Sequence, residues 1–240
     1  MNFSKIKKMV LGLSILFSIG FTQAQDRWSR VENDIKVAVS VDTLKKGKYT
    51  LVYIDKAKGF DPTVKQKLID VFFVNYPLLA KKYNKKAMTK VIFVMDPDYD
   101  GIAAAGGGVI RFNPEWFKKN PGDIDIVTHE GMHIVQGYPG GAGPGWITEG
   151  IADYVRFVNG IDNAGANWSL PELKPDHHYE NAYRITARFF YWIEKNVKKG
   201  TMVKLDNAMR TKTYSADFWN NQTGKTIDEL WALYVSNPAI

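Results

Sequence analysis

The pentapeptide His129-Glu130-Gly131-Met132-His133 constrains the fold of this chain more than any other segment. Residues four apart on an α-helix lie one turn apart and about 40° around the axis, so both imidazoles can reach one metal ion. Glu130 is turned about 100° away and can instead reach a water on that ion. H-E-x-x-H on a helix is typical of zinc sites in which the glutamate acts as general base. A surface helix with two chance histidines is the alternative, although the chain holds only 4 histidines in all.

A catalytic zinc needs a third protein ligand and keeps one position open for water. Residues 137–145 include five glycines and two prolines, which predicts a loop. A helix is expected over Trp146–Val158, directly after that loop. If the second helix folds back on the first, Glu149 faces the histidines and supplies the third ligand.

Asp153 follows Glu149 by four positions and therefore lies on the same helix face. It is expected to accept a hydrogen bond from the ring nitrogen of His129 that faces away from the metal, a common arrangement that sets the tautomer. Two alternatives remain open: Asp153 is the third ligand, or both acids form an exposed pair. Apolar neighbours argue against exposure, and these are Trp146, Ile147, Ile151 and Ala152.

The first 24 residues have the order of a secretory signal peptide. Met1–Lys8 carries three lysines and no acid, Met9–Phe21 is apolar, and small Ala24 ends the segment. The apolar run of about 13 residues is shorter than the roughly 20 that a membrane span needs. The chain has no cysteine for a lipid anchor. We therefore expect a secreted or periplasmic protein with no membrane association after cleavage.

The mature chain is expected to be one domain, residues 25–240. Removal of three lysines from a formal charge of +7 leaves +4, without the basic blocks typical of nucleic-acid binders. No cysteine is present, so stability must come from a packed core, which 45% hydrophobic composition allows. We expect a monomer that does not bind nucleic acid and whose partner is a polypeptide substrate.

Periodicity predicts an α+β fold with a mixed β-sheet lobe first, a mainly helical lobe last, and the H-E-x-x-H helix at their join. Strands are expected at Ile35–Val41, Tyr49–Ile54, Lys90–Met95 and Val109–Phe112. Helices are expected at Pro62–Tyr83, Asp123–Gln136, Tyr179–Val197, Met202–Arg210, Ser215–Asn220 and Ile227–Val235.

The glycine-rich stretch Gly106–Phe112 has two interpretations. As an edge strand beside the motif helix, it can pair with an extended substrate backbone, and its glycines allow close approach. A tight turn within the sheet is the alternative.

Two blocks of the chain resemble the basic secretory protein family, whose members are assigned to the zincin-like peptidases with a glutamate ligand. The first block runs from His129 to Arg156, and the second is Tyr183–Phe189, which is similar to the family's Y-x-x-T-A-R-F segment. The similarity covers about residues 50–220. The segment after Gly160 does not follow the family pattern, which leaves the substrate-side residues open.

The resemblance implies a zincin-like domain with His129, His133 and Glu149 as zinc ligands, Glu130 as base, and peptide-bond hydrolysis as the reaction. The oxyanion of the transition state needs a donor besides zinc. Tyr183 is chosen because it lies in the second family block, although a core tyrosine at helical spacing is an equal alternative. Other candidates for this role are Tyr179, His177 and His178.

The leading hypothesis is a secreted zinc endopeptidase. An aminopeptidase is the second hypothesis, but no G-x-M-E-N segment is present to hold a substrate amine. The third is a binding or glycan-associated protein with a structural zinc site. An open position on the metal with Glu130 beside it argues against that third hypothesis.

Overall fold

The computed structural model describes residues 30–240, so the signal peptide expected at 1–24 lies outside the described residues. A helix at 30–36 comes first. The strands are β1 (Ser40–Lys46), β2 (Tyr49–Asp55), β3 (Lys90–Met95), β4 (Ala103–Gly106) and β5 (Val109–Phe112). The α-helices that follow β1 are α2 (Pro62–Lys82), α3 (Pro114–Lys119), α4 (Ile126–Gln136), α5 (Gly145–Asn159), α6 (Tyr183–Asn196), α7 (Thr201–Arg210), α8 (Asp217–Thr223) and α9 (Ile227–Ser236). The expected mixed α+β class is confirmed.

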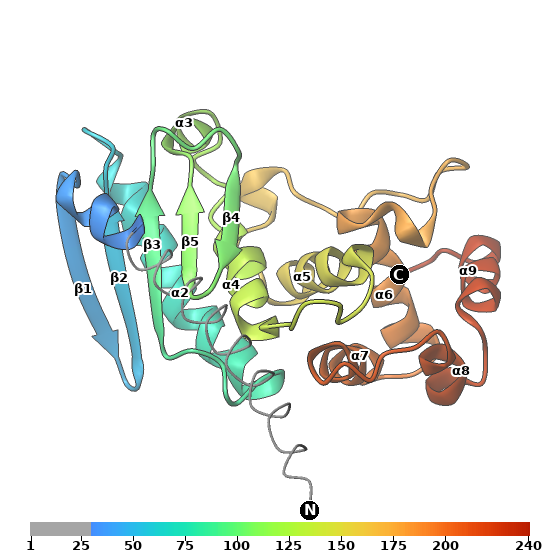
Figure 1. Cartoon of the computed structure of the whole chain (residues 1–240). Helices are drawn as coiled ribbons and strands as arrows, with labels where there is room; N and C mark the ends of the chain where they lie inside the picture. The colour runs from blue at the N-terminus through green and yellow to red at the C-terminus, as the bar shows by residue number, and fades with distance from the viewer. Residues whose placement is uncertain (1–29) are drawn as a thin grey trace, which may run out of the picture.

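The five strands form one mixed sheet in the order β1-β2-β3-β5-β4. β2, β3 and β5 run parallel, whereas β1 and β4 are antiparallel to their neighbours. The parallel pair β2–β3 is joined through α2, the usual crossover for parallel strands. β4 is the edge strand nearest α4, and the helices α5 to α9 lie beyond α4 on the side away from the sheet (Figure 1).

The prediction of a strand at Ile35–Val41 is wrong. Residues 30–36 are helical and only the end of the expected segment belongs to β1. The buried Asp34 carboxylate holds this helix on the sheet, because it pairs with Lys56 Nζ at 3.2 Å and with Arg111 Nη2 at 2.6 Å. The alternating valines that suggested a strand are largely exposed, so they mark no buried face: Val37, Val39 and Val41.

The main core lies between one sheet face and α2 and continues into the helices. On α2, buried side chains recur at helical spacing, and they include Val64, Leu68, Phe72, Tyr76 and Leu79. A smaller cluster of Val31, Val52, Ile54, Ile92 and Val94 covers the other face. Among residues 30–240, no helix has the length and apolarity of a membrane span.

Packing on both sides fixes α4. It contacts α2, β4 and α5, and nearly all of its side chains are buried. Gly137 ends the helix in the left-handed conformation, with φ of 50°, which is typical of a C-terminal cap. On α5, Gly150 lets α6 approach closely, since a Cβ there would lie 2.3 Å from Thr186 Cγ2. α4 is thus held by α2, β4 and α5, and α5 is held in turn by α6.

Candidate metal centre

Helix α4 presents His129 and His133 one turn apart, as the motif predicts. Their Nε2 atoms lie 3.1 Å from each other. Each Nδ1 has a hydrogen-bond acceptor elsewhere, so the neutral tautomers are those with the proton on Nδ1. In those tautomers both Nε2 atoms present lone pairs to the same point, an arrangement that suits a shared cation.

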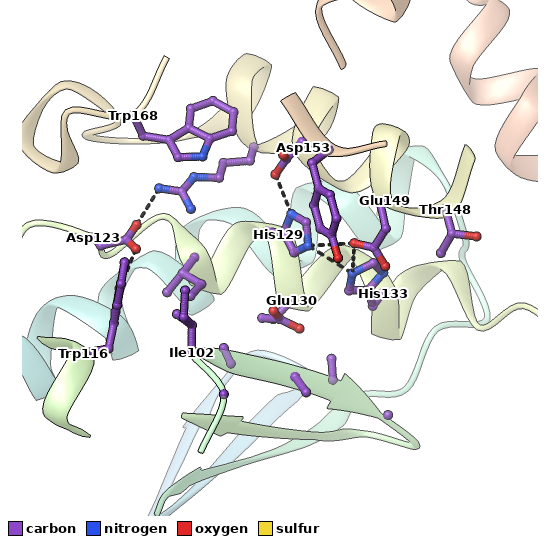
Figure 2. A pocket seen from close by; sticks show the side chains of 18 of the residues that line it. Ile102, Trp116, Asp123, His129, Glu130, His133, Thr148, Glu149, Asp153 and Trp168 are labelled. Carbon is purple, nitrogen blue, oxygen red and sulfur yellow. Dashed lines mark hydrogen bonds and ion pairs between the residues drawn. The ribbon is translucent and has the colours of Figure 1, made fainter. Parts of the chain in front are cut away.

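Glu149 of α5 reaches the same point from the other side (Figure 2). Its Oε2 atom lies 3.3 Å from His129 Nε2 and 3.4 Å from His133 Nε2. Tetrahedral zinc with bonds of about 2.0–2.1 Å places neighbouring ligand atoms roughly 3.3 Å apart. The three side chains therefore fit zinc in both donor type and spacing. Within residues 30–240, no other group of three His, Cys, Asp or Glu side chains has this convergence.

Asp153 and Gln136 hold the two imidazoles in place. Asp153 Oδ1 accepts a hydrogen bond from His129 Nδ1 at 2.6 Å, so it faces away from the point where the Nε2 atoms meet. Gln136 Oε1 accepts from His133 Nδ1 at 2.8 Å, and its Nε2 donates to the Thr148 carbonyl of α5 at 2.9 Å. The sequence analysis missed Gln136, whose only signal was its place three residues after His133.

The charges of the site are strongly coupled. Burial disfavours protonation of His129, but the carboxylates of Asp153 and Glu149 outweigh it and raise its pKa to about 10. Burial likewise acts to raise the pKa of Glu149, yet its hydrogen bonds to the two histidines lower it to about 2. The carboxylates that favour a positive charge on His129 equally favour a divalent cation at this position.

Glu130 is buried, lines the same cleft, and lies below the two imidazoles in the view of Figure 2. Burial raises its pKa above the usual value for glutamate, and the two histidines oppose this. A carboxylate with a raised pKa is better matched to proton transfer near neutral pH.

Tyr183 begins α6 and faces the cleft rather than the core. Its side chain is 55% exposed, and its ring stacks on His129 with the centroids 6.4 Å apart. The backbone is strained here, because Ala182 and Tyr183 have φ of 63° and 49° without being glycine. The alternative of a core tyrosine is therefore wrong. The hydroxyl of Tyr179 is engaged with Asp228 at 2.7 Å, and neither His177 nor His178 lines the cleft.

The metal-ligand candidates lie in a cleft of about 1190 Å³. The edge strand β4 forms one wall, with the small side chains of Ala103, Ala104 and Ala105. The edge strand expected at Gly106–Phe112 is thus misplaced, because β5 is paired on both sides. Gly107 and Gly108 instead form the turn between β4 and β5, with φ of 57° and 85°.

At the other end of the cleft lie residues that the sequence analysis did not identify: Trp116, Asp123, Arg156 and Trp168. Trp168 belongs to the segment that followed no family pattern. Neither tryptophan carries a spacing signal that connects it to the metal motif.

Comparisons with known proteins identify the family of this chain. Two solved structures are similar at low identity: a two-domain M1 zinc metallopeptidase variant with bound L-tryptophan (14% identity, TM-score 0.49) and an M1 zinc metallopeptidase variant from Deinococcus radiodurans (13%, 0.47). The matches cover 84% and 83% of this chain but only 52% of each of those chains. No match was found among curated proteins. Residues 52–234 match the BSP family, described as a peptidase of plants and bacteria, and the chain belongs to that family.

Proposed function

We propose that this protein is an exported zinc endopeptidase in which His129, His133 and Glu149 bind the metal and Glu130 is the general base. The convergence of two Nε2 atoms and one carboxylate oxygen carries the proposal. Zinc fits this donor set, and the three protein ligands leave a fourth position open, as catalytic sites require. When bound, zinc supplies a Lewis acid and lowers the pKa of its water toward 7.

The residues of the chain perform the proton transfers. Glu130 takes the proton of the attacking water and passes it to the leaving amine. The Tyr183 hydroxyl donates a hydrogen bond to the oxyanion that develops on the substrate carbonyl. Its strained backbone supports this role, since strain is retained where the surrounding structure holds a functional side chain in place.

The open edge of β4 suits an extended polypeptide substrate. Within residues 30–240, β4 is an edge strand that pairs with β5 alone, and its residues line the cleft. An extended peptide can add there as a further strand, and the alanine side chains leave room for it.

Internal peptide bonds fit the cleft better than N-terminal residues. An aminopeptidase needs a carboxylate that holds the substrate amine, and four carboxylates line the cleft. Glu149 faces the metal position, Asp153 is bonded to His129, and Asp123 is paired with Arg156. Only Glu130 remains, and the proposed mechanism uses it as base.

Hydrolysis of casein by the zinc-loaded protein tests the proposal. Glu130→Gln keeps the shape of the side chain but removes the base, so activity is expected to fall by at least about 100-fold. Glu172→Gln, an exposed position outside the cleft, is the matched control and keeps full activity. Equal activity of Glu130→Gln and wild type would exclude the peptidase mechanism and favour a structural zinc site.

Export is part of the proposal and needs a separate measurement. The basic, apolar and small-residue order of residues 1–24 supports a cleaved signal peptide. Mass spectrometry of protein recovered outside the cytoplasm is expected to find Gln25 as the first residue. An intact N-terminus on that protein would contradict cleavage.

A further inference from the structure

One end of the cleft is rich in aromatic side chains, and we call it the tryptophan pocket. It is lined by Trp116, Asp123, Ile126, Arg156 and Trp168. Ile126 lies one helical turn before His129 on α4, and Arg156 lies nearly one turn after Asp153 on α5. The pocket therefore adjoins the metal site on the side of His129 and Asp153 (Figure 2).

Polar contacts fix both indole rings. Trp116 Nε1 donates to Asp123 Oδ2 at 2.8 Å, and the other oxygen of Asp123 pairs with Arg156 Nη2. The Arg156 guanidinium stacks on the Trp168 ring, 4.5 Å from its centroid. Both indoles are half-buried, so part of each ring remains accessible from the cleft.

The loop that carries Trp168 is anchored at several points. The buried carboxylate of Asp125 accepts hydrogen bonds from the backbone N–H groups of Ile161 and Asp162, at 2.8 and 2.6 Å. Asn163 Nδ2 donates to the Arg156 carbonyl at 3.0 Å. The loop is thus held on the N-terminal end of α4, and the pocket exists before any substrate binds.

The chemistry of the pocket favours a flat apolar group. Ile126 and two indoles provide apolar walls, and Asp123 and Arg156 neutralise each other. A charged side chain would find no unpaired counter-charge inside. Arg184 also lines the cleft, but it is exposed and follows Tyr183 in the sequence rather than belonging to this pocket.

We propose that the tryptophan pocket binds a large apolar side chain, aromatic by preference, of the substrate residue beside the scissile bond. This inference rests on the proposed peptidase function and adds the substrate class. Trp168 is the specificity-determining residue, because it closes the pocket from a loop outside the metal-binding helices.

A peptide series that varies one position among Phe, Leu, Ala, Asp and Lys tests the inference, with cleavage positions assigned by mass spectrometry. Wild type is expected to cleave beside Phe at least about tenfold faster than beside Ala in kcat/KM, since apolar pockets discriminate by this order. Trp168→Ala should bring the two rates within about threefold and leave the zinc content unchanged. Trp168→Phe retains a flat ring and should keep the preference, which separates lost selectivity from misfolding.

A binding measurement separates failure of the pocket from failure of the peptidase mechanism. Calorimetry with the zinc-loaded Glu130→Gln variant compares N-acetyl-phenylalanine amide with N-acetyl-alanine amide. Tighter binding of the aromatic amide, reduced in Glu130→Gln/Trp168→Ala, supports the pocket even if wild type hydrolyses no peptide. Equal binding of both amides, a preference for Asp or Lys peptides, or unchanged preference in Trp168→Ala would overturn it.

Discussion

The two halves of the cleft are built in different ways. The metal half comes from two consecutive helices, and its residues lie between His129 and Asp153. The tryptophan half combines α3, the turn before α4, the end of α5 and the loop after Gly160. The first is organised by short sequence spacing and the second by tertiary contacts. Chemistry and selectivity are therefore expected to change independently on mutation.

The two halves also differ in charge. Three carboxylates, from Glu130, Glu149 and Asp153, gather around two imidazoles in the metal half. In the tryptophan half one carboxylate and one guanidinium form a closed pair. The first half has the excess negative charge that suits a divalent cation, whereas the charges of the second half neutralise each other. The mutations below test this contrast in order of expected effect on hydrolysis.

The largest effect is expected from Glu149→Ala. Loss of the third ligand should abolish detectable hydrolysis and weaken zinc binding by more than about 100-fold. Even residues that only hydrogen-bond to a metal ligand contribute about 10- to 100-fold to metal affinity. Competition with a chelating dye measures the affinity. Glu172→Ala removes an exposed carboxylate outside the cleft and should change neither. Full zinc affinity in Glu149→Ala would show that the metal half does not bind through this residue.

Tyr183→Phe should lower kcat by about 100-fold with unchanged zinc affinity, since removal of one oxyanion donor typically costs 10²–10³. The ring that stacks on His129 is retained, so only the hydroxyl is lost. Tyr191→Phe on the same helix is the matched control, because Tyr191 does not line the cleft. An equal loss in both variants would assign the effect to α6 packing.

The metal half could be predicted from sequence because helix geometry alone places its residues. A spacing of four residues places His129 and His133 on one face of their helix, and Glu149 and Asp153 on one face of the next. The glycine-rich loop between the two helices predicted that the chain reverses its direction there. Long periodic helices such as α2 were predicted for the same reason.

The tryptophan half could not be predicted in this way. Trp168 becomes part of the cleft only because Asp125 and Arg156 hold its loop against α4, and no local pattern encodes those contacts. The helix at 30–36 was missed for a related reason, since the buried pairing of Asp34 with Lys56 and Arg111 overrides the β-propensity of nearby valines. Tertiary contacts between residues far apart in the sequence decided both regions.

Within the metal half, removing the hydrogen-bond partners of the two imidazoles should weaken zinc binding to unequal extents. Asp153→Asn removes the charged partner of His129, and Gln136→Leu removes the neutral partner of His133. Each is expected to weaken zinc binding by about 10- to 100-fold, with Asp153→Asn at the upper end because charge-assisted hydrogen bonds are stronger. Zinc titrations of both variants measure the difference. Unchanged affinity in both would mean that the imidazoles need no orienting partners.

The smallest effect on turnover is expected in the tryptophan half, where Asp123→Asn should lower stability instead. The substitution keeps the shape but leaves the buried Arg156 guanidinium without a counter-charge, which costs about 3 kcal/mol. For a chain of this size that lowers Tm by roughly 6–12 °C. Asp42→Asn breaks an ion pair with Lys65 that is half exposed, and it should cost less than about 1 kcal/mol. Zinc affinity should stay within about threefold in both variants. A large loss of zinc affinity in Asp123→Asn would show that the two halves are coupled, because the ion pair would then support α4 and α5 at the metal as well as at the pocket.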